Sequence, residues 1–448
     1  MPNPEIGNRK SGRMGMGCTM LAAAWTGCLI LAADASAAAT AVRAPAPLRD
    51  LGRASEVQLV YFVPADREPV RAWRDKITVV ATFVADLYRR DLRRHGHATR
   101  GLDFEFDSAG RPVVHLVRGE RKAAYYNGAP DFTFRRQWRT VLPEVEADLG
   151  PRAEHLHVVF AETYVRGPAP FEWRGGVALG RRAGARGGAG LFSAWILRDA
   201  FCAATVRDQV RLLADETPIR GRVALGSGRK DSPRFEFIED GFGAVAHELG
   251  HALGLLHDHR AGGRYVMGSG FRRLRRNYVG PEPKAPVGFS RANARLLAHS
   301  PFLAEDPDPE DTEPPVVRLE APAGPLRVGA TKVPLAGLAT DARGLAAAVY
   351  FVREMDSVVA GKDLTGREDA GVRRGVSPYP PRATAKALSS AVGAETHRAK
   401  RATPATEADL SAALPVRPLK AGTCRVRVLV IDRGGNIGSA EVAYTVRE

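Results

Sequence analysis

One stretch of the chain decides how the rest is interpreted: Ala246-His247-Glu248-Leu249-Gly250-His251-Ala252-Leu253-Gly254-Leu255-Leu256-His257-Asp258. His247 and His251 are four residues apart, so on a helix their imidazoles project from one face about one turn apart. Two histidines at this spacing can hold one Zn²⁺ in common. The sequence therefore predicts a helix that carries two metal ligands.

Gly254 supplies the turn that a third ligand needs. The predicted helix must stop near this residue, and glycine takes a left-handed conformation without a Cβ penalty, so the chain can bring His257 toward the same metal. Three neutral imidazoles leave one tetrahedral position for water, as in catalytic zinc sites. The prediction is one catalytic Zn²⁺ held by His247, His251 and His257, with structural Ca²⁺ left open.

Glu248 adjoins the first ligand and is predicted to be the catalytic residue. Bound zinc lowers the pKa of water toward about 7 and polarises a carbonyl, while Glu248 acts as general base and then as general acid toward the leaving amine. The alternative is a core helix that merely contains histidines. Five fixed positions of this kind arise by chance in roughly a few of 10⁵ such chains, which disfavours that alternative.

These residues resemble the metzincin zinc endopeptidases. The positions that match the extended zinc motif of that clan are His247, Glu248, His251, Gly254 and His257. Asp258, directly after the third histidine, is similar to the reprolysin and snapalysin branches. The resemblance implies an α+β catalytic domain, with a mixed sheet, helices and an active-site helix, that hydrolyses peptide bonds.

The resemblance also implies a Met-turn beneath the metal. The candidate is Tyr265-Val266-Met267-Gly268-Ser269-Gly270, in which Met267 would form the floor of the site without binding the metal. An ordinary core methionine is the alternative. Ser269 stands where astacin-like members carry a tyrosine, so no tyrosine ligand is transferred to this chain. The helical pattern over 289–297 corresponds to the helix expected after a Met-turn.

The N-terminus reads as an export signal over residues 1–37. Arg9, Lys10 and Arg13 precede an apolar stretch, and Ala35-Ser36-Ala37 is a small-residue cleavage site. An uncleaved N-terminal anchor is the alternative. We expect a secreted or extracytoplasmic protein, in the periplasm or at the cell surface, with no stable membrane span once the signal is removed.

Charge and cysteine content narrow the function classes further. The 448 residues carry 65 Lys and Arg against 50 Asp and Glu, a net charge of +15. This balance favours acidic partners, but export makes intracellular DNA and RNA improbable ones, which leaves a polypeptide substrate and an acidic surface polymer. With four cysteines, two of them in the signal, a disulfide scaffold is excluded. Cys202 and Cys424 are predicted to be free or buried.

Six acids and four prolines over 305–315 divide the chain into two predicted domains. We expect a metzincin-like peptidase domain over 55–303, an acidic, proline-rich linker over 304–315, and an Ig- or fibronectin-like β-sandwich over 316–448. Residues of about 362–415 have few large apolar side chains, so they are predicted to form a disordered insertion. The strands expected downstream are Val316 to Leu319, Val333 to Leu338, Ala347 to Val352, Arg425 to Ile431 and Glu441 to Val446.

Upstream of the linker, strand-like and helix-like patterns alternate. The expected strands are Val57 to Val63, Leu156 to Phe160, and a hairpin of Leu102 to Phe106 with Val113 to Val117. The expected helices are Val70 to Arg94, Asp199 to Leu213 and one from Phe242 onward. Gly175 to Gly190 is interpreted as a mobile loop around a short strand, Val177 to Leu179, whose edge could pair with an extended substrate.

Other polar residues carry weaker signals. His155 and His157 would share one face of a strand and could suggest a second metal, but ordinary strand histidines are the favoured interpretation, as they are for His95 and His97. His259 is an alternative third ligand. Arg272, Arg273, Arg275 and Arg276 either line the substrate cleft or form a solvated basic loop.

The main hypothesis is a secreted zinc metalloendopeptidase. Two other classes stay open: an extracellular binding or adhesion protein with a vestigial zinc site, and a zinc hydrolase of non-peptide amides or esters. The intact Glu248 argues against the vestigial site, whereas the third class differs only in its cleft.

Overall fold

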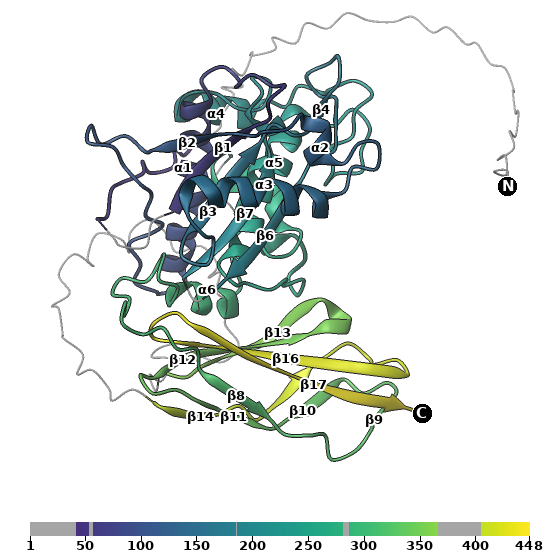
Figure 1. Ribbon diagram of the computed structural model, residues 1–448. Helices are drawn as coiled ribbons and strands as arrows, with labels where there is room; N and C mark the ends of the chain where they lie inside the picture. The colour runs from purple at the N-terminus through teal and green to yellow at the C-terminus, as the bar shows by residue number, and fades with distance from the viewer. Residues whose placement is uncertain (1–41, 53–56, 185, 281–285, 366–404) are drawn as a thin grey trace, which may run out of the picture. The chain divides into compact units, whose positions relative to one another are not determined.

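The structure, a computed structural model, describes residues 42–52, 57–184, 186–280, 286–365 and 405–448. Thr40–Glu448 form one compact unit. The predicted export signal lies outside the described residues, as does the central part of the predicted insertion. We call residues 57–304 the α/β region and residues 316–447 the β region, because helices and strands mix in the first while the second is built almost entirely of strands (Figure 1).

A five-stranded mixed sheet forms the centre of the α/β region, in the order β2-β1-β3-β7-β6. Its strands are β1 (Val57–Val63), β2 (Val114–Arg118), β3 (Leu156–Ala161), β6 (Ala178–Ala183) and β7 (Gly187–Ser193). The first four strands in this order are parallel, and β6 runs antiparallel to β7 at the edge. The predicted mixed sheet with helices is thus observed.

Helices cover both faces of this sheet, which explains why β1 and β3 are apolar on both faces. The α-helices are α1 (Trp73–Arg94), α2 (Ala123–Asn127), α3 (Phe134–Leu149), α4 (Val206–Ala214), α5 (Arg234–Ala252) and α6 (Arg291–Ala298). Leu59 and Tyr61 join the core formed with α1 and α5, whereas Val60 and Phe62 face the core formed with α3. Short elements connect them: β4 (Val165–Arg166), β5 (Trp173–Arg174), η1 (Ala194–Leu197), η2 (Gly262–Arg264) and η3 (Gly270–Asn277).

The predicted mobile loop over 175–190 is wrong. Residues 178–184 and 186–190 belong to the β6–β7 hairpin, in which the predicted short strand over 177–179 overlaps the start of β6, and their glycines permit a close approach to α5. A Cβ atom on Gly180 would overlap the main-chain carbonyl oxygen of Glu248, and one on Gly188 would crowd that of Ala252. The glycine-rich composition therefore reflects tight packing of backbone on backbone.

Two further predictions for this region need correction. Residues 102–106 form no strand: Phe106 makes only an isolated bridge to Pro112, and β2 pairs in parallel with β1. The helix predicted from Asp199 begins at Val206, because the side chain of Thr205 caps it by accepting a hydrogen bond from the main-chain N–H of Asp208. The helix predicted from Phe242 begins earlier, at Arg234.

The β region holds sheets of the orders β13-β12-β16-β17-β9, β14-β11-β8 and β10-β15. Its strands are β8 (Val316–Leu319), β9 (Leu326–Arg327), β10 (Lys332–Leu335), β11 (Gly337–Thr340), β12 (Leu345–Val352), β13 (Ser357–Asp363), β14 (Glu407–Asp409), β15 (Ala412–Pro415), β16 (Gly422–Asp432) and β17 (Ile437–Arg447). A single turn, η4 (Arg353–Met355), precedes β13. The predicted insertion over 362–415 is wrong at its C-terminal end, because Leu410 and Leu414 are buried in the core and order β14 and β15.

Two smaller predictions can be compared with the described residues. Cys202 and Cys424 are both free and both buried, as predicted. Within the described ranges, no helix combines the length and the apolar character that a membrane crossing requires.

His157 behaves as a buried strand histidine. It lies in β3 with no exposed surface, and its Nε2 is 3.1 Å from the carbonyl oxygen of Gly150, so the neutral ring donates from Nε2. The groups of potential metal ligands among the described residues include neither His155 nor His157. The structure thus supports the ordinary interpretation of this pair.

His157→Gln is expected to weaken the acid dependence of stability. Burial lowers the pKa of His157 in the folded chain to about 4, whereas an unfolded histidine titrates at about 6.5. Between these values the unfolded chain binds the additional proton, so the free energy of unfolding falls as pH decreases from about 6.5 to about 4. Between pH 7 and pH 5 this group alone accounts for about 2 kcal/mol, measurable by urea unfolding at both pH values.

The control is His155→Gln, two residues earlier at a half-buried position. His97, whose pKa is lowered to about 4 by burial, contributes the same pH dependence to every variant and cancels in the comparison. An equal change in stability between pH 7 and pH 5 for wild type and His157→Gln would contradict the assignment.

Candidate metal centre

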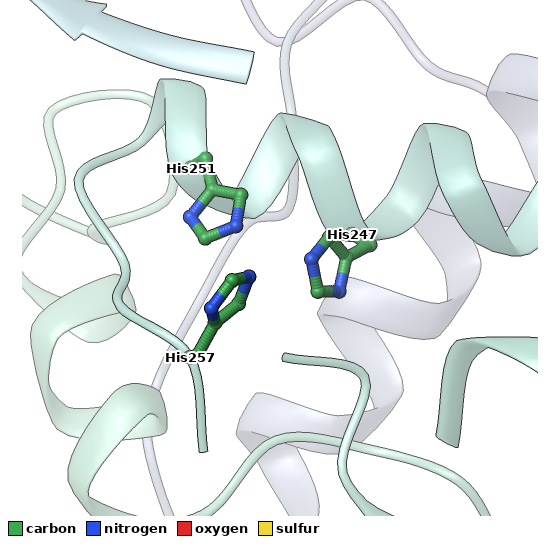
Figure 2. Close-up of side chains that lie close together, drawn as sticks. All are labelled: His247, His251 and His257. Carbon is green, nitrogen blue, oxygen red and sulfur yellow. The ribbon is translucent and has the colours of Figure 1, made fainter. Parts of the chain in front are cut away.

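Helix α5 presents His247 and His251 on one face. Figure 2 shows the two rings side by side along the helix, with centroids 4.8 Å apart, as the four-residue spacing requires. The helix ends in a Schellman motif: the N–H of Gly254 donates to the carbonyl of His251, and that of Leu255 donates to the carbonyl of Gly250. Gly254 has a φ of 94°, the positive value predicted for this turn.

His257 faces the helix from the loop that follows this turn (Figure 2). Its ring centroid is 5.3 Å from that of His247 and 4.7 Å from that of His251. One ring nitrogen from each of the three histidines lies within 4.8 Å of the other two, a grouping able to hold a metal ion. The structure therefore brings the three predicted ligands together.

The hydrogen bonds of the three rings leave the same nitrogen free on each. Nδ1 of His247 lies 2.7 Å from the carbonyl oxygen of Val266, and Nδ1 of His251 lies 2.8 Å from that of Leu255. Nδ1 of His257 lies 2.8 Å from Oδ2 of Asp356. Since each acceptor holds the proton on Nδ1, each Nε2 keeps its lone pair for a metal, and this donor set fits zinc.

Burial favours the neutral rings that a metal needs. It lowers the pKa of His247 to about 3 and that of His251 to about 4, with each ring also repelling the charge of its neighbours. A neutral imidazole is the form that binds zinc, so at His247 and His251 protonation does not compete with metal binding near neutral pH.

Met267 lies directly beneath the helix that carries the ligands. It has no exposed surface, and its sulfur and methyl group occupy the space that a Cβ on Gly250 would need. The same segment positions its neighbours through the main chain: Val266 accepts from His247, and Met267 accepts from the N–H of Asp258 at 2.8 Å. Met267 is thus buried against α5, and its role as the floor of a metal site stays a prediction.

Glu248 is bonded to the edge strand. Its Oε2 accepts a hydrogen bond of 2.7 Å from the N–H of Gly180 in β6. Burial raises the pKa of Glu248, while the bond from Gly180 and the nearby His257 act in the opposite direction. The carboxylate therefore lies between α5 and β6, the strand whose outer edge is unpaired within the sheet.

The space beside α5 is partly apolar. A cavity of about 340 Å³ is lined by Val177 and Ala178 of the edge segment, by Trp195, and by Ala244, one turn before Glu248. Ser193 also lines this cavity, and its buried hydroxyl has no hydrogen-bond partner among the described residues.

The four arginines after the predicted Met-turn line a second cavity, of about 440 Å³, together with acidic residues of α5. Arg272 is paired with Asp240 at 3.4 Å, and the main-chain N–H of Arg275 donates to Glu239 at 2.6 Å. Burial raises the pKa of Glu239 to about 8 and that of Asp240 to about 6. Two of the four guanidinium groups are paired with acidic side chains, Arg272 with Asp240 and Arg275 with Glu216, so this segment is not a purely solvated loop.

Three residues of this site were not predicted from the sequence. Phe271 packs its ring 4.8 Å from that of His247, Gly180 holds Glu248, and Asp356 holds His257. The glycine-rich composition around position 180 marks the segment, but composition alone does not show that Gly180 packs against Glu248. Nothing near Asp356 in the sequence marks it.

No protein-family model matches the chain, and no curated protein matches its sequence. Solved structures of OgpA from Akkermansia muciniphila resemble it in fold. The complex of catalytically inactive OgpA with an O-glycopeptide substrate has a TM-score of 0.54 at 15% identity, covering 90% of this chain and 95% of that one. Two crystal forms of wild-type OgpA each have a TM-score of 0.53, at 15% and 17% identity, covering 90% of this chain and 96% and 94% of theirs. The likeness establishes a shared fold across the α/β and β regions.

Proposed function

We propose that this protein is a zinc-dependent endopeptidase of the metzincin type. The observation that carries the proposal is the convergence of three histidines, each with Nδ1 bonded to an acceptor, around a point beside Glu248 and the unpaired edge strand β6. The fold shared with OgpA supports it.

The proposed mechanism assigns each residue a task. His247, His251 and His257 would hold Zn²⁺, which when bound lowers the pKa of water and polarises a carbonyl. Glu248 would take a proton from the attacking water and deliver it to the leaving amine. The N–H of Gly180 keeps the carboxylate oriented until substrate arrives.

The edge strand β6 would bind the substrate backbone. A peptide lying antiparallel to β6 would gain main-chain hydrogen bonds, and its side chain next to the reacting bond would enter the cavity beside Ala244. Main-chain hydrogen bonds of this kind orient the peptide but discriminate little between peptides of different sequence. Specificity would then depend on the cavity and on groups attached to the peptide.

The solved OgpA complex suggests which attached group to test first. That complex holds an O-glycopeptide, so we propose an O-glycosylated peptide as the substrate class. The direct experiment compares two peptides of identical sequence, one with a sugar on a single serine or threonine and one without. Faster cleavage of the glycosylated member supports this class; equal rates support a general endopeptidase.

Metal removal tests the whole proposal. The protein without its predicted signal is expected to bind about one zinc per chain, to cleave the glycosylated or the unmodified peptide, and to lose all measurable activity in a chelator, with recovery on adding zinc. Zinc content by elemental analysis and product masses are the measurements. Secretion is a separate expectation, tested by locating the protein in its native cell.

The remaining classes have distinct outcomes in this experiment. Binding to a surface polymer without hydrolysis of any peptide would favour the adhesion protein with a vestigial site. Zinc-dependent hydrolysis of simple amides or esters, with peptides left intact, would favour the non-peptide hydrolase. An acidic polymer as an additional partner stays a prediction from charge alone.

A further inference from the structure

The loop that carries His257 is bound by the β region. The N–H of Val358 donates to the carbonyl of His257 at 2.8 Å, and the N–H of His259 donates to Oγ of Ser357 at 2.9 Å. Arg260 adds a bond of 3.0 Å to the carbonyl of Val359. The start of β13 therefore runs along the segment that supplies the third predicted ligand.

Asp356 contacts the ligand itself. It occupies the turn between η4 and β13, with a φ of 46°, a conformation that aspartate tolerates better than most residues. Its Oδ2 lies 2.8 Å from Nδ1 of His257, across 99 positions of the chain. His247 and His251, in contrast, are held by carbonyl groups of the α/β region, so His257 is the one predicted ligand held by a carboxylate.

We infer that Asp356 is a positioning residue for the metal centre, and that the β region thereby completes the site. This inference rests on the proposed zinc site. A carboxylate that accepts from Nδ1 fixes the tautomer and the orientation of the ring and makes Nε2 a stronger donor. Without the Asp356 carboxylate, the ring of His257, which lies on a loop after the helix, would have no hydrogen-bond partner to select its tautomer.

The alternative role for Asp356 is that of a metal ligand. His257, His259 and Asp356 also form a group that could hold an ion. Two ligands of one tetrahedral ion, each about 2.1 Å from it, lie about 3.4 Å apart. The 2.8 Å between Nδ1 and Oδ2 is a hydrogen-bond distance, which favours the positioning role.

Zinc affinity of the metal-free protein tests the inference. Asp356→Ala is expected to weaken zinc binding by about 10- to 100-fold, measured by competition with a chromophoric chelator. Asp356→Asn, which keeps an acceptor but loses the charge, should weaken it less. The rise in melting temperature on adding zinc should shrink in the same order, while the melting temperature of the metal-free protein changes little.

The matched control is Glu354→Gln, which removes a carboxylate two residues away that pairs with Arg425 and not with the metal loop. It should bind zinc as wild type does. If Asp356→Ala does not fold, Asp356→Asn alone decides the test.

The outcomes separate this inference from the proposed function. Wild-type affinity in both Asp356 variants overturns the inference alone. Two zinc ions per wild-type chain and one in Asp356→Ala overturn it in favour of a ligand role. A wild-type chain that binds no zinc overturns the metal site and the inference together. Weakened zinc binding in the variants of a protein that cleaves no peptide supports the inference and contradicts the proposed endopeptidase.

Discussion

Glu248→Gln is expected to reduce kcat/KM by about 10²- to 10⁴-fold while zinc content stays at the wild-type level. Glutamine has the shape of glutamate and keeps an oxygen that can accept from the N–H of Gly180, so the contact with β6 survives. It cannot take a proton from water. The measurements are steady-state cleavage of the glycosylated and unmodified peptide pair, and elemental analysis of the purified variant.

Glu236→Gln is the matched control, because it makes the same change of charge in the first turn of the same helix, where Glu236 pairs with Arg229. Its activity should stay within about twofold of wild type, because Glu236 lies about three helical turns from Glu248 on α5 and its partner Arg229 is exposed. Cleavage by Glu248→Gln at the wild-type rate would remove the proposed general base. Loss of zinc in Glu248→Gln would show instead that the variant damages the site.

Gly180→Ala is expected to have the second-largest effect. The added Cβ would overlap the carbonyl oxygen of Glu248, a rigid backbone atom, so β6 must move away from α5. Displacement of about 1 Å in a positioning element costs on the order of 10²-fold in rate, and overpacking of this kind destabilises a fold by about 1–3 kcal/mol. Both the edge that would bind substrate and the N–H that holds Glu248 shift together.

Gly176→Ala provides the comparison, because a Cβ there would meet its nearest neighbour, Oγ of Ser193, at an ordinary 3.6 Å. We expect near-normal thermal stability and zinc binding from it; Gly176 also lines the cavity beside Ala244, so its kcat/KM does not serve as the control. Zinc binding should persist in both variants, since neither moves the histidines. A Gly180→Ala enzyme with unchanged kcat/KM would argue that β6 does not position the reaction.

Local sequence predicted the helical part of the site well. A four-residue spacing on a helix dictates that His247 and His251 lie on one face. The turn at Gly254 was predicted because glycine tolerates a left-handed conformation, and the observed φ is positive. The buried strands β1 and β3 were also predicted. Short runs of apolar residues that alternate with helical patterns are typical of central strands, whose two faces are both covered by helices.

Predictions failed where glycines and small residues mediated tertiary contacts. The β6–β7 hairpin was interpreted as a mobile loop, since composition alone does not distinguish a flexible glycine from one that makes room for a neighbouring backbone. Gly180 and Gly188 are of the second kind. The order of strands in the sheet, with β6 at its edge, depends on pairings that no local window contains.

By itself, then, the sequence determined the local arrangement of the candidate site. It showed which imidazoles share a helix face, where that helix turns, and which carboxylate adjoins the first predicted ligand. Only the tertiary structure decided what holds those groups in place. The N–H of Gly180 lies 68 positions before Glu248, and Asp356 lies 99 positions after His257. Helical periodicity is a local property of the backbone, whereas hydrogen bonds between distant segments exist only after the sheet and the β region have formed around the helix.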